Sequence, residues 1–422
     1  GTGPFSRDLA AGITTFLTMS YIVVVNPAIL STAGTGIPFS GALTATVMVC
    51  FTMTLLMGLY ARLPYGVAPG MGLNAFFTYT LIINGGVSWP VALGITFWAG
   101  VAFLLVSLTP LRERMAVAIP LPLRSATAAG IGLLLTFIGL QNGGFVAANP
   151  ATMVGVGPLD HRAAFTLVAL LVSVFLSRRD SPFAFLAGIA LVTAGAWIGG
   201  YVSPPAAWLS APDFSSVFLK LDARGALQLS LLPALVTVML TDLFDSLSTF
   251  IGVSHAAKLT DERGAPKNLR QGLIVDAFAT LGGGLFGSSA GTAYVESVAG
   301  IKMGGRTGTS AIITACCFLP CLFIAPIAAA VPPYATSAVL ILVGVTMFQS
   351  VATVPFDRLE IAVPAFATLI LIPLTFSITQ GILWGFILHA ALHVVAGRTR
   401  DVTAAAWGLA AVSIALLMIE HG

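Results

Sequence analysis

Residues Thr280 to Lys302 read TLGGGLFGSSAGTAYVESVAGIK, and the predicted architecture follows from this segment. A glycine-bearing stretch, Gly282–Gly291, precedes a segment at 292–302 that would form a helix of roughly 16 Å. The hydrocarbon core of a membrane is about 30 Å thick, so this helix is too short to cross it. Non-helical backbone at membrane depth persists only where protein or a cavity satisfies its polar groups. A broken segment that carries an acid, Glu296, therefore indicates a buried polar site.

The composition is that of a helical membrane protein. The 422 residues are 57% hydrophobic and 8% charged, with a mean hydropathy of +0.98, whereas soluble domains average about 25% charged residues. The apolar runs are long and do not alternate, which excludes a transmembrane β-barrel. The net charge of +3 comes from loop Lys and Arg and does not indicate a nucleic-acid surface. The first run lacks a cleavage site, so we interpret it as a span and not a signal peptide.

We predict about fourteen membrane segments from the apolar runs. They lie at residues 8–27, 38–60, 70–84, 87–109, 123–141, 160–177, 182–201, 228–253, 270–287, 292–302, 307–330, 335–352, 359–376 and 379–397. With the N-terminus inside, 16 of the 19 Lys and Arg residues fall in inside gaps. Positive charges mark the cytoplasmic side, so we expect a plasma (inner) membrane protein with a cytoplasmic N-terminus. The apolar stretch 402–419 is a further span, an interfacial helix or a sign of a wrongly divided segment.

The layout predicts an inverted repeat. The gap at 202–227 separates seven segments from seven, and an odd number per half reverses the polarity of the second half. The third segment of the first half is also short, because residues 72–83 would span roughly 18 Å after the irregular stretch 64–72. Two half-helices that meet at mid-membrane direct their N-termini into a shared cavity. Close helix packing is the alternative explanation for the glycines at 282–284.

A series of motifs, in order, resembles the AzgA-like purine permeases of the nucleobase–cation symporter (nucleobase–ascorbate) superfamily. The likeness runs from the first segment to about residue 390. The motifs are AGITTFLTMSY at 11–21 with Asn26-Pro27, GMGLNAFF at 70–77, DLFD at 242–245, YVES at 294–297, Ala299-Gly300, GGRTG at 304–308, VPAF at 363–366 and SITQGI at 377–382. The set is specific, although no single motif is.

This resemblance implies a fold and an activity. The fold is an all-α 7+7 inverted repeat in which a core domain (residues 1–110 and 226–331) moves against a gate domain (111–205 and 332–398), with an extra apolar segment at 399–422. The implied activity is proton-driven uptake of adenine, guanine or hypoxanthine, and a homodimer is plausible by analogy. The chain departs from the family pattern at 246–249 and 288–293, beside the expected ligand, which leaves the preferred purine open.

Four acids lie within apolar stretches: Asp242, Asp245, Asp276 and Glu296. A charge at mid-membrane costs about 3 kcal/mol on insertion scales, so such groups face a cavity or a partner. The resemblance assigns the site acids to Asp245 and Glu296. We expect Glu296 to accept two purine N–H bonds, because charge-assisted bonds are the strong ones. Asp245 would be a second acceptor or would carry the proton, and Glu296 is also a candidate for proton coupling. Asp242, on the same helix face, would line the cavity and take part in proton coupling, or would bond a broken neighbour.

The other candidates surround these acids. Backbone N–H groups near Asn74 and Thr292–Tyr294 would donate to ring acceptors of the purine. An apolar slot for the ring faces would come from Phe76, Phe77, Tyr294 or Phe244. We expect Asp276 to form an ion pair with Arg270 or Lys267, and Arg306 to anchor the cytoplasmic end of the second broken segment.

No metal or cofactor is expected. His389 and His393 have the spacing of a ligand pair, but no third ligand is near in sequence, and the four cysteines are interpreted as packing residues. An anion transporter of the same fold is the main alternative function, and the acids at the site argue against it. An enzyme is disfavoured because no HExxH or nucleophile motif occurs. A channel is disfavoured because pores usually arise by subunit symmetry, whereas this chain carries its own repeat.

Overall fold

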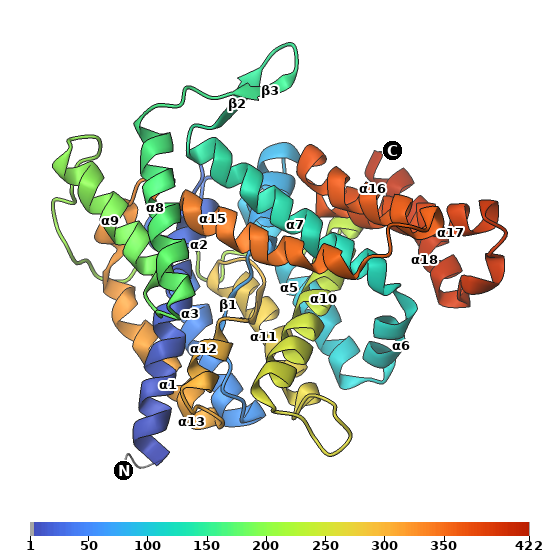
Figure 1. Cartoon of the computed structure of the whole chain (residues 1–422), viewed down its shortest axis with the longest axis horizontal. Helices are drawn as coiled ribbons and strands as arrows, with labels where there is room; N and C mark the ends of the chain where they lie inside the picture. The colour runs from blue at the N-terminus through green and yellow to red at the C-terminus, as the bar shows by residue number, and fades with distance from the viewer. Residues whose placement is uncertain (1–3, 422) are drawn as a thin grey trace.

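The structure is a computed structural model that describes residues 4–421, and it is almost entirely helical (Figure 1). Within this range nine helices are long and apolar enough to cross a membrane. Eight of these, three shorter apolar helices, α11 (Leu269–Phe286) and the two broken segments account for the fourteen predicted segments. The ninth long helix is α18 (Ala404–His421), which packs against α17 (Ile378–Val395). The predicted all-helical membrane fold is confirmed.

The helices pack into two groups. The first, called here the core bundle, contains α1 (Pro4–Met19), α2 (Ile22–Leu30), α3 (Phe39–Leu56), α5 (Trp89–Leu108), α10 (Leu232–Ala257), α11 and α13 (Gly308–Phe318). The second, the flanking bundle, contains α7 (Leu121–Asn142), α8 (His161–Arg178), α9 (Ala184–Ile198), α15 (Pro333–Phe348), α16 (Leu359–Thr375) and α17. Figure 1 shows α7 and α15 crossing the centre, with α8 and α9 at one end and α16 and α17 at the other. The predicted core and gate domains, and their relative motion, stay predictions.

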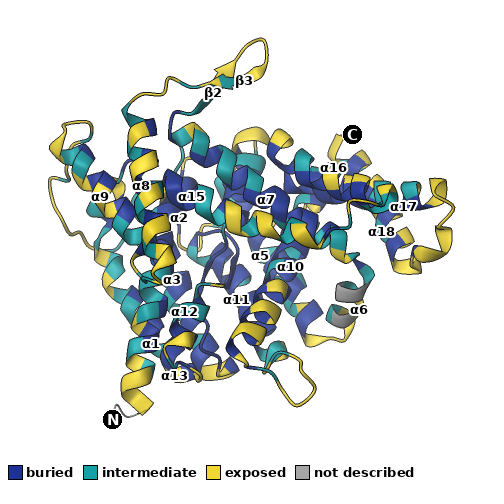
Figure 2. Cartoon of the chain, viewed as in Figure 1, coloured by how far each residue is buried: buried dark blue, intermediate teal, exposed yellow. Residues whose placement is uncertain are grey.

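The outer faces are apolar. Leu171, Phe175 and Ile198 on α8 and α9 are 69%, 55% and 88% exposed, and Figure 2 shows exposed residues along both helices. A soluble protein rarely exposes so large an apolar patch, whereas a membrane solvates it. The helices around the centre are buried instead, which places the polar site away from lipid.

The two broken segments meet as a small β-ladder. Strand β1 (Val67–Pro69) pairs antiparallel with β4 (Gly291–Ala293), with Ala68 opposite Thr292. Helix α4 (Leu73–Ala75), extended as the π-helix η2 (Phe76–Asn84), follows β1, and α12 (Ser297–Lys302) follows β4. Pairing satisfies the extended backbone that the sequence places at membrane depth. These segments are therefore short helices preceded by extended chain, as predicted.

The chain around the second broken segment differs from the prediction at two points, the start of its helix and the end of the preceding helix. The helix begins at Ser297 and not at residue 292, because residues 291–293 are held extended by β1. Helix α11 continues through Gly282–Gly284 and ends at Gly287, whose φ of +103° suits only glycine. A Cβ on Gly284 would lie 2.7 Å from the Leu93 carbonyl oxygen of α5. Close packing is thus the role of the triple glycine.

Smaller elements occupy the connections. A hairpin of β2 (Val146–Asn149) and β3 (Met153–Val156), which the sequence analysis did not predict, projects from the end of α7 (Figure 1). Helix α6 (Leu111–Ala118) joins the two bundles, α14 (Ala325–Ala329) precedes α15, and short 3₁₀ turns lie at η3 (Leu229–Leu231), η4 (Leu319–Phe323), η5 (Gln349–Thr353) and η6 (Thr399–Asp401). A π-helical turn, η1 (Met57–Ala61), ends the α3 segment.

Gly300 in α12 gives a packing prediction. A Cβ there would lie 1.9 Å from the Thr15 hydroxyl and 2.5 Å from the Ala11 carbonyl, so Gly300→Ala forces α12 away from α1. Overpacking of this kind costs about 1–3 kcal/mol. We expect a lower apparent melting temperature by size-exclusion chromatography of heated, detergent-solubilised protein. Gly252→Ala in α10, where a Cβ meets nothing within 4 Å, is the matched control and should leave stability equal or higher. Equal melting of both variants would show that α1 and α12 do not pack as described.

The long connection at 202–227 is attached to α3 through Asp213. The Asp213 carboxylate accepts hydrogen bonds from the Ser216 hydroxyl (2.6 Å), the Ser40 hydroxyl of α3 (2.8 Å) and the Ser215 and Ser216 amides. These donors, above all the Ser216 hydroxyl, hold the pKa of Asp213 below its ordinary value. The carboxylate therefore stabilises the docked loop above the unfolded pKa of about 3.9, and this contribution is lost as the pH falls through the lowered pKa.

Because the ionised form of Asp213 stabilises the docked loop, we predict that acid releases this loop. Limited proteolysis of residues 202–227 should accelerate in the parent protein as the pH falls below about 4. Asp213→Asn should be cleaved faster at neutral pH and should show little further change on acidification, because its amide does not titrate. A parent loop whose cleavage is independent of pH would contradict this attachment.

Candidate functional site

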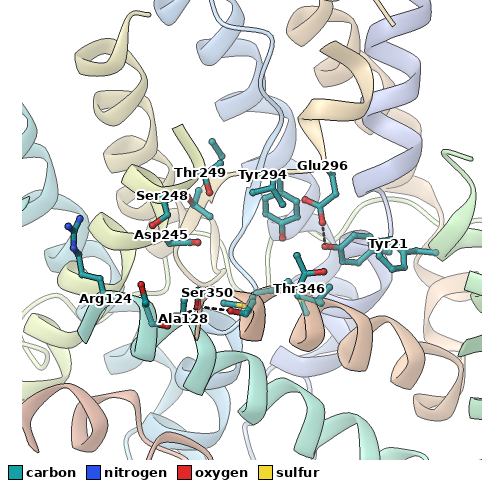
Figure 3. A pocket seen from close by; sticks show the side chains of 18 of the residues that line it. Tyr21, Arg124, Ala128, Asp245, Ser248, Thr249, Tyr294, Glu296, Thr346 and Ser350 are labelled. Atoms are coloured by element: carbon teal, nitrogen blue, oxygen red, sulfur yellow. Dashed lines mark hydrogen bonds between the residues drawn. The ribbon is translucent and has the colours of Figure 1, made fainter. Parts of the chain in front are cut away.

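A cavity of about 310 Å³ lies between the two bundles, beside the β1–β4 ladder. The core bundle lines it with Tyr21, Asp245 and the chain from Thr292 to Glu296. The flanking bundle lines it with the first turns of α7, with Phe185 of α9 and with the end of α15. Figure 3 shows Glu296 and Tyr21 on one side of this space and Asp245 with Ser248 on the other. The cavity thus contains two acids from segments far apart in sequence.

Glu296 lies directly before α12, at the break in the second broken segment. Its carboxylate does not cap the helix and points into the cavity. The Tyr21 hydroxyl, at the junction of α1 and α2, donates a 2.8 Å hydrogen bond to Glu296 Oε1 (Figure 3). This bond fixes one carboxylate oxygen and leaves acceptor capacity on Glu296 for a ligand.

Asp245 lies midway along α10 and also faces the cavity. Among the described residues, no group donates a hydrogen bond to its carboxylate and no Lys, Arg or His lies within 4 Å of it. Buried polar groups normally have partners. A partly buried carboxylate with none is therefore placed to take its partner from the cavity.

The other two acids lie behind the cavity wall. Asp242 is fully buried, and its Oδ2 accepts a hydrogen bond from Thr280, whose hydroxyl also reaches the Gly291 carbonyl at 3.2 Å. Asp276 Oδ2 accepts from the Thr292 hydroxyl (3.1 Å) and the Ala293 amide (3.2 Å). Asp276 thus supports strand β4 directly, whereas Asp242 bonds the Thr280 side chain of α11, and neither acid lines the cavity.

The predicted ion pair of Asp276 with Arg270 or Lys267 is wrong. Asp276 faces β4 in the interior of the core bundle, whereas Arg270 and Lys267 are exposed near the start of α11. Arg306 was expected to anchor the cytoplasmic end of the second broken segment. Its guanidinium donates a hydrogen bond to the Ala257 carbonyl, at the end of α10.

The structure separates the other predicted site residues into two sets. Thr292 and Tyr294 line the cavity, and the Tyr294 hydroxyl donates to the Pro69 carbonyl of β1. Phe76 and Phe77 are 1% and 2% exposed in the core, outside the cavity lining. Phe244 lines two smaller adjoining pockets.

Asn74 connects the two broken segments instead of facing the cavity. Its amide donates to Asn26 Oδ1 (3.1 Å), and Asn26 in turn donates to the Thr46 hydroxyl (2.8 Å) and the Ser288 hydroxyl (3.2 Å). Asn74 Oδ1 accepts from the Gly72 and Ala75 amides, which fixes the start of α4. A fully buried amide with these partners positions backbone and is not free for a ligand.

Several cavity residues were missed by sequence reasoning. Tyr21 lies inside a quoted motif, but nothing in the sequence places its hydroxyl against Glu296. Val343, Thr346, Met347 and Ser350 on the α15 segment resemble any apolar helix and gave no signal. Arg124 did carry a signal, as a cation within a predicted segment, but was interpreted as a boundary charge.

An aromatic cluster joins the two bundles at a distance from Arg124. Phe376, after α16, packs edge-on against Tyr79 of η2 (5.8 Å between ring centroids) and Phe137 of α7 (5.4 Å). The Thr80 hydroxyl donates to the Phe376 carbonyl. Phe137 lies roughly 20 Å along α7 from Arg124. The two bundles therefore touch at this cluster, whose residues lie outside the cavity lining.

Among the side chains that the structure describes, no group of three or more His, Cys, Asp or Glu is arranged to hold an ion. His393 Nδ1 lies 2.7 Å from the His389 carbonyl oxygen.

The fold and the site together define a membrane transport protein, in which two broken segments meet at a polar cavity between two helix bundles. The chain belongs to the Permease family (Xan_ur_permease), whose model matches residues 7–384. This family is one of transporters and not of enzymes. The likeness to a purine permease family that the motifs predicted is confirmed at the level of family membership.

Named relatives match nearly the whole chain. The adenine permease AdeP of Escherichia coli (strain K12) is 38% identical over 94% of this chain and 89% of its own length. The guanine/hypoxanthine permease PbuO of Bacillus subtilis (strain 168) is 37% identical over 94% and 93%.

Solved structures share the fold at low identity. The transmembrane domain of the cyanobacterial bicarbonate transporter BicA has a TM-score of 0.67 at 17% identity and covers 90% of this chain and 96% of that domain. The inward-facing murine Solute Carrier 26 family member A9 anion transporter has a TM-score of 0.63 at 11% identity, over 92% and 68%. These matches support the 7+7 inverted-repeat fold alone.

Proposed function

We propose that this protein takes up purine nucleobases, adenine, guanine or hypoxanthine, together with protons. The observation that carries the proposal is the cavity that holds Glu296 and Asp245 between aromatic walls. Its volume of about 310 Å³ lies at the low end of the range for small-molecule sites, which suits a compact bicyclic ring. The names of the relatives, adenine and guanine/hypoxanthine permeases, support this substrate class.

The walls match the chemistry of a purine. Its edges carry N–H donors and ring-nitrogen or carbonyl acceptors, and its faces are weakly apolar. Glu296 supplies a charged acceptor for an N–H pair, and the hydroxyls of Ser248 and Thr249 supply donors. Tyr294 and Phe185 supply aromatic surface for the ring faces.

Asp245 is the proposed carrier of the proton. An ionised carboxylate without a partner is costly away from water. Protonation neutralises Asp245. The carrier with purine bound then moves between its outward-facing and inward-facing states without that buried charge. Release of the purine opens the site to water and favours loss of the proton. Substrate and proton would therefore move together.

We propose that the flanking bundle acts as the gate and that the core bundle carries the substrate past it. The distribution of Lys and Arg supports a cytoplasmic N-terminus and a cytoplasmic Arg124 end of the cavity. The arrangement described is then inward-facing, with the Phe376 cluster as the outer closure. The homodimer stays a prediction.

Uptake into proteoliposomes tests the substrate class and the coupling. Tritiated adenine, guanine and hypoxanthine should enter saturably when the outside is acidic, and the unlabelled purines should compete. Uracil, xanthine and sulfate serve as comparison competitors. Uptake of sulfate, or purine uptake that needs sodium and ignores a proton gradient, would contradict the proposal. Empty liposomes and a Glu262→Gln variant, altered in the exposed α10–α11 loop, are the controls.

A further inference from the structure

We propose that Arg124 is the counter-charge of Asp245 on the flanking bundle: it pairs with that carboxylate when the site is empty and lets the unloaded carrier return. This inference rests on the proposed proton-coupled function. It assigns Arg124 as a positioning residue for the return step and not as a ligand of the purine.

The position of Arg124 is unusual for a cation. It lies in the first turn of α7, inside a helix long and apolar enough to span a membrane, and it lines the cavity. It is the sole Lys or Arg among the residues that line the cavity. Its Nε is buried and has no hydrogen-bond partner among the described residues. Among the acids whose side chains the structure describes, none lies within ion-pair distance of it.

A second, smaller cavity of about 50 Å³ places Arg124 opposite Asp245. Arg124 and Thr127 of α7 line one side of it, and Thr241, Asp245 and Ser248 of α10 line the other. Thr241 Oγ1 is also buried without a partner. Figure 3 shows Arg124 on the same side of the main cavity as Asp245 and Ser248, away from Glu296. Arg124 Nε on the α7 wall and Thr241 Oγ1 on the α10 wall thus both lack hydrogen-bond partners across this small cavity.

The charges explain why this gap should close. The acids that face the main cavity are Asp245 and Glu296, and Glu296 already bonds Tyr21. A lone guanidinium and a lone carboxylate in a membrane interior each carry a desolvation penalty that pairing relieves. The guanidinium fork matches a carboxylate in two parallel hydrogen bonds. Because Arg124 and Asp245 lie on different bundles, a small relative movement of the bundles joins or separates them.

The protonated and the ionised forms of Asp245 then serve different steps of the transport cycle. In the loaded carrier, a proton neutralises Asp245 and the purine occupies the cavity. In the empty carrier, Asp245 has lost its proton, and Arg124 takes the place of that proton as the neutralising charge. Removal of Arg124 leaves the loaded step intact and hinders the return of the empty carrier.

Two transport modes separate these steps. Net uptake of tritiated hypoxanthine or adenine into empty proteoliposomes needs the empty carrier to return, whereas exchange against the same unlabelled purine inside does not. We expect Arg124→Gln to lower net uptake about tenfold or more and to leave exchange within about twofold of the parent. Arg124→Lys should recover most of the net uptake, because it keeps the charge. Arg263→Gln, in the exposed α10–α11 loop, is the matched control and should behave as the parent in both modes.

The other possible results of these transport measurements would each overturn a stated claim. Equal loss of both modes with a raised KM would make Arg124 a substrate ligand and overturn the inference, as would normal transport in both modes. Size-exclusion profiles of the purified variants separate misfolding from a transport defect, and Arg124→Lys provides the folded comparison. Failure of the parent to exchange purines would refute the proposed function itself, whereas a competent parent with a normal Arg124→Gln variant would refute only this inference.

Discussion

Replacement of Glu296 by Gln should lower purine uptake by about 10- to 100-fold at substrate concentrations below KM. A hydrogen bond to a charged group contributes about 1.5–3 kcal/mol, and each 1.4 kcal/mol is a factor of ten. Gln keeps the size of Glu but offers one oxygen acceptor and an amide donor, which opposes a purine N–H. The loss should appear in both net uptake and exchange of tritiated purine, because Glu296 acts in binding.

Tyr21→Phe is the matched control for this prediction. It removes the hydroxyl that donates to Glu296 Oε1 at 2.8 Å and leaves the acid in place. We expect a reduction of about tenfold or less, since a typical hydrogen bond contributes about 1 kcal/mol net. If Glu296→Gln transports like the parent while Tyr21→Phe is impaired, then Glu296 is not the purine acceptor and the site is misplaced.

Asp245→Asn should abolish accumulation of purine against its gradient. The amide cannot exchange a proton, so an inward proton gradient no longer drives transport, and the ratio of internal to external purine should fall to about one. Downhill exchange should continue, because a permanently neutral residue resembles the protonated acid. Accumulation and exchange measured in the same proteoliposomes, with and without an acidic exterior, test this pattern.

Asp261→Asn provides the comparison for the loss of an acid from the core bundle. Asp261 lies in the exposed α10–α11 loop, where its carboxylate accepts from the Arg263 and Ala265 amides. This variant should accumulate purine as the parent does. Proton-driven accumulation that survives in Asp245→Asn would move the coupling role to another group, and Glu296 would be the next acid to examine.

The sequence predicts the architecture well because its signals are local. Long apolar runs, the bias of Lys and Arg, and short glycine-bearing segments each depend on neighbouring residues. The helix boundary at Ser297 could not be predicted in this way, because it depends on pairing of residues 291–293 with residues 67–69. Asn74 illustrates the same limit, since its partner Asn26 lies in another segment.

The candidate site contains some residues that the sequence could predict and others that it could not. Motif resemblance pointed to Glu296 and Asp245, and the structure brings both to one cavity, but their roles stay predictions. The contribution of α15 could not be predicted, because Thr346 and Ser350 in an apolar helix do not reveal which face meets the core bundle. Phe76 and Phe77 were chosen for their aromatic rings, yet an aromatic side chain in a membrane protein is ordinarily part of the packed core.

A structure determined with the best-transported purine bound would test the central claim most directly. We predict density for the purine in the cavity between the bundles, with ring N–H groups within about 3 Å of the Glu296 carboxylate and with Asp245 facing the same cavity. A purine bound elsewhere, with Glu296 and Asp245 both out of reach, would contradict the account.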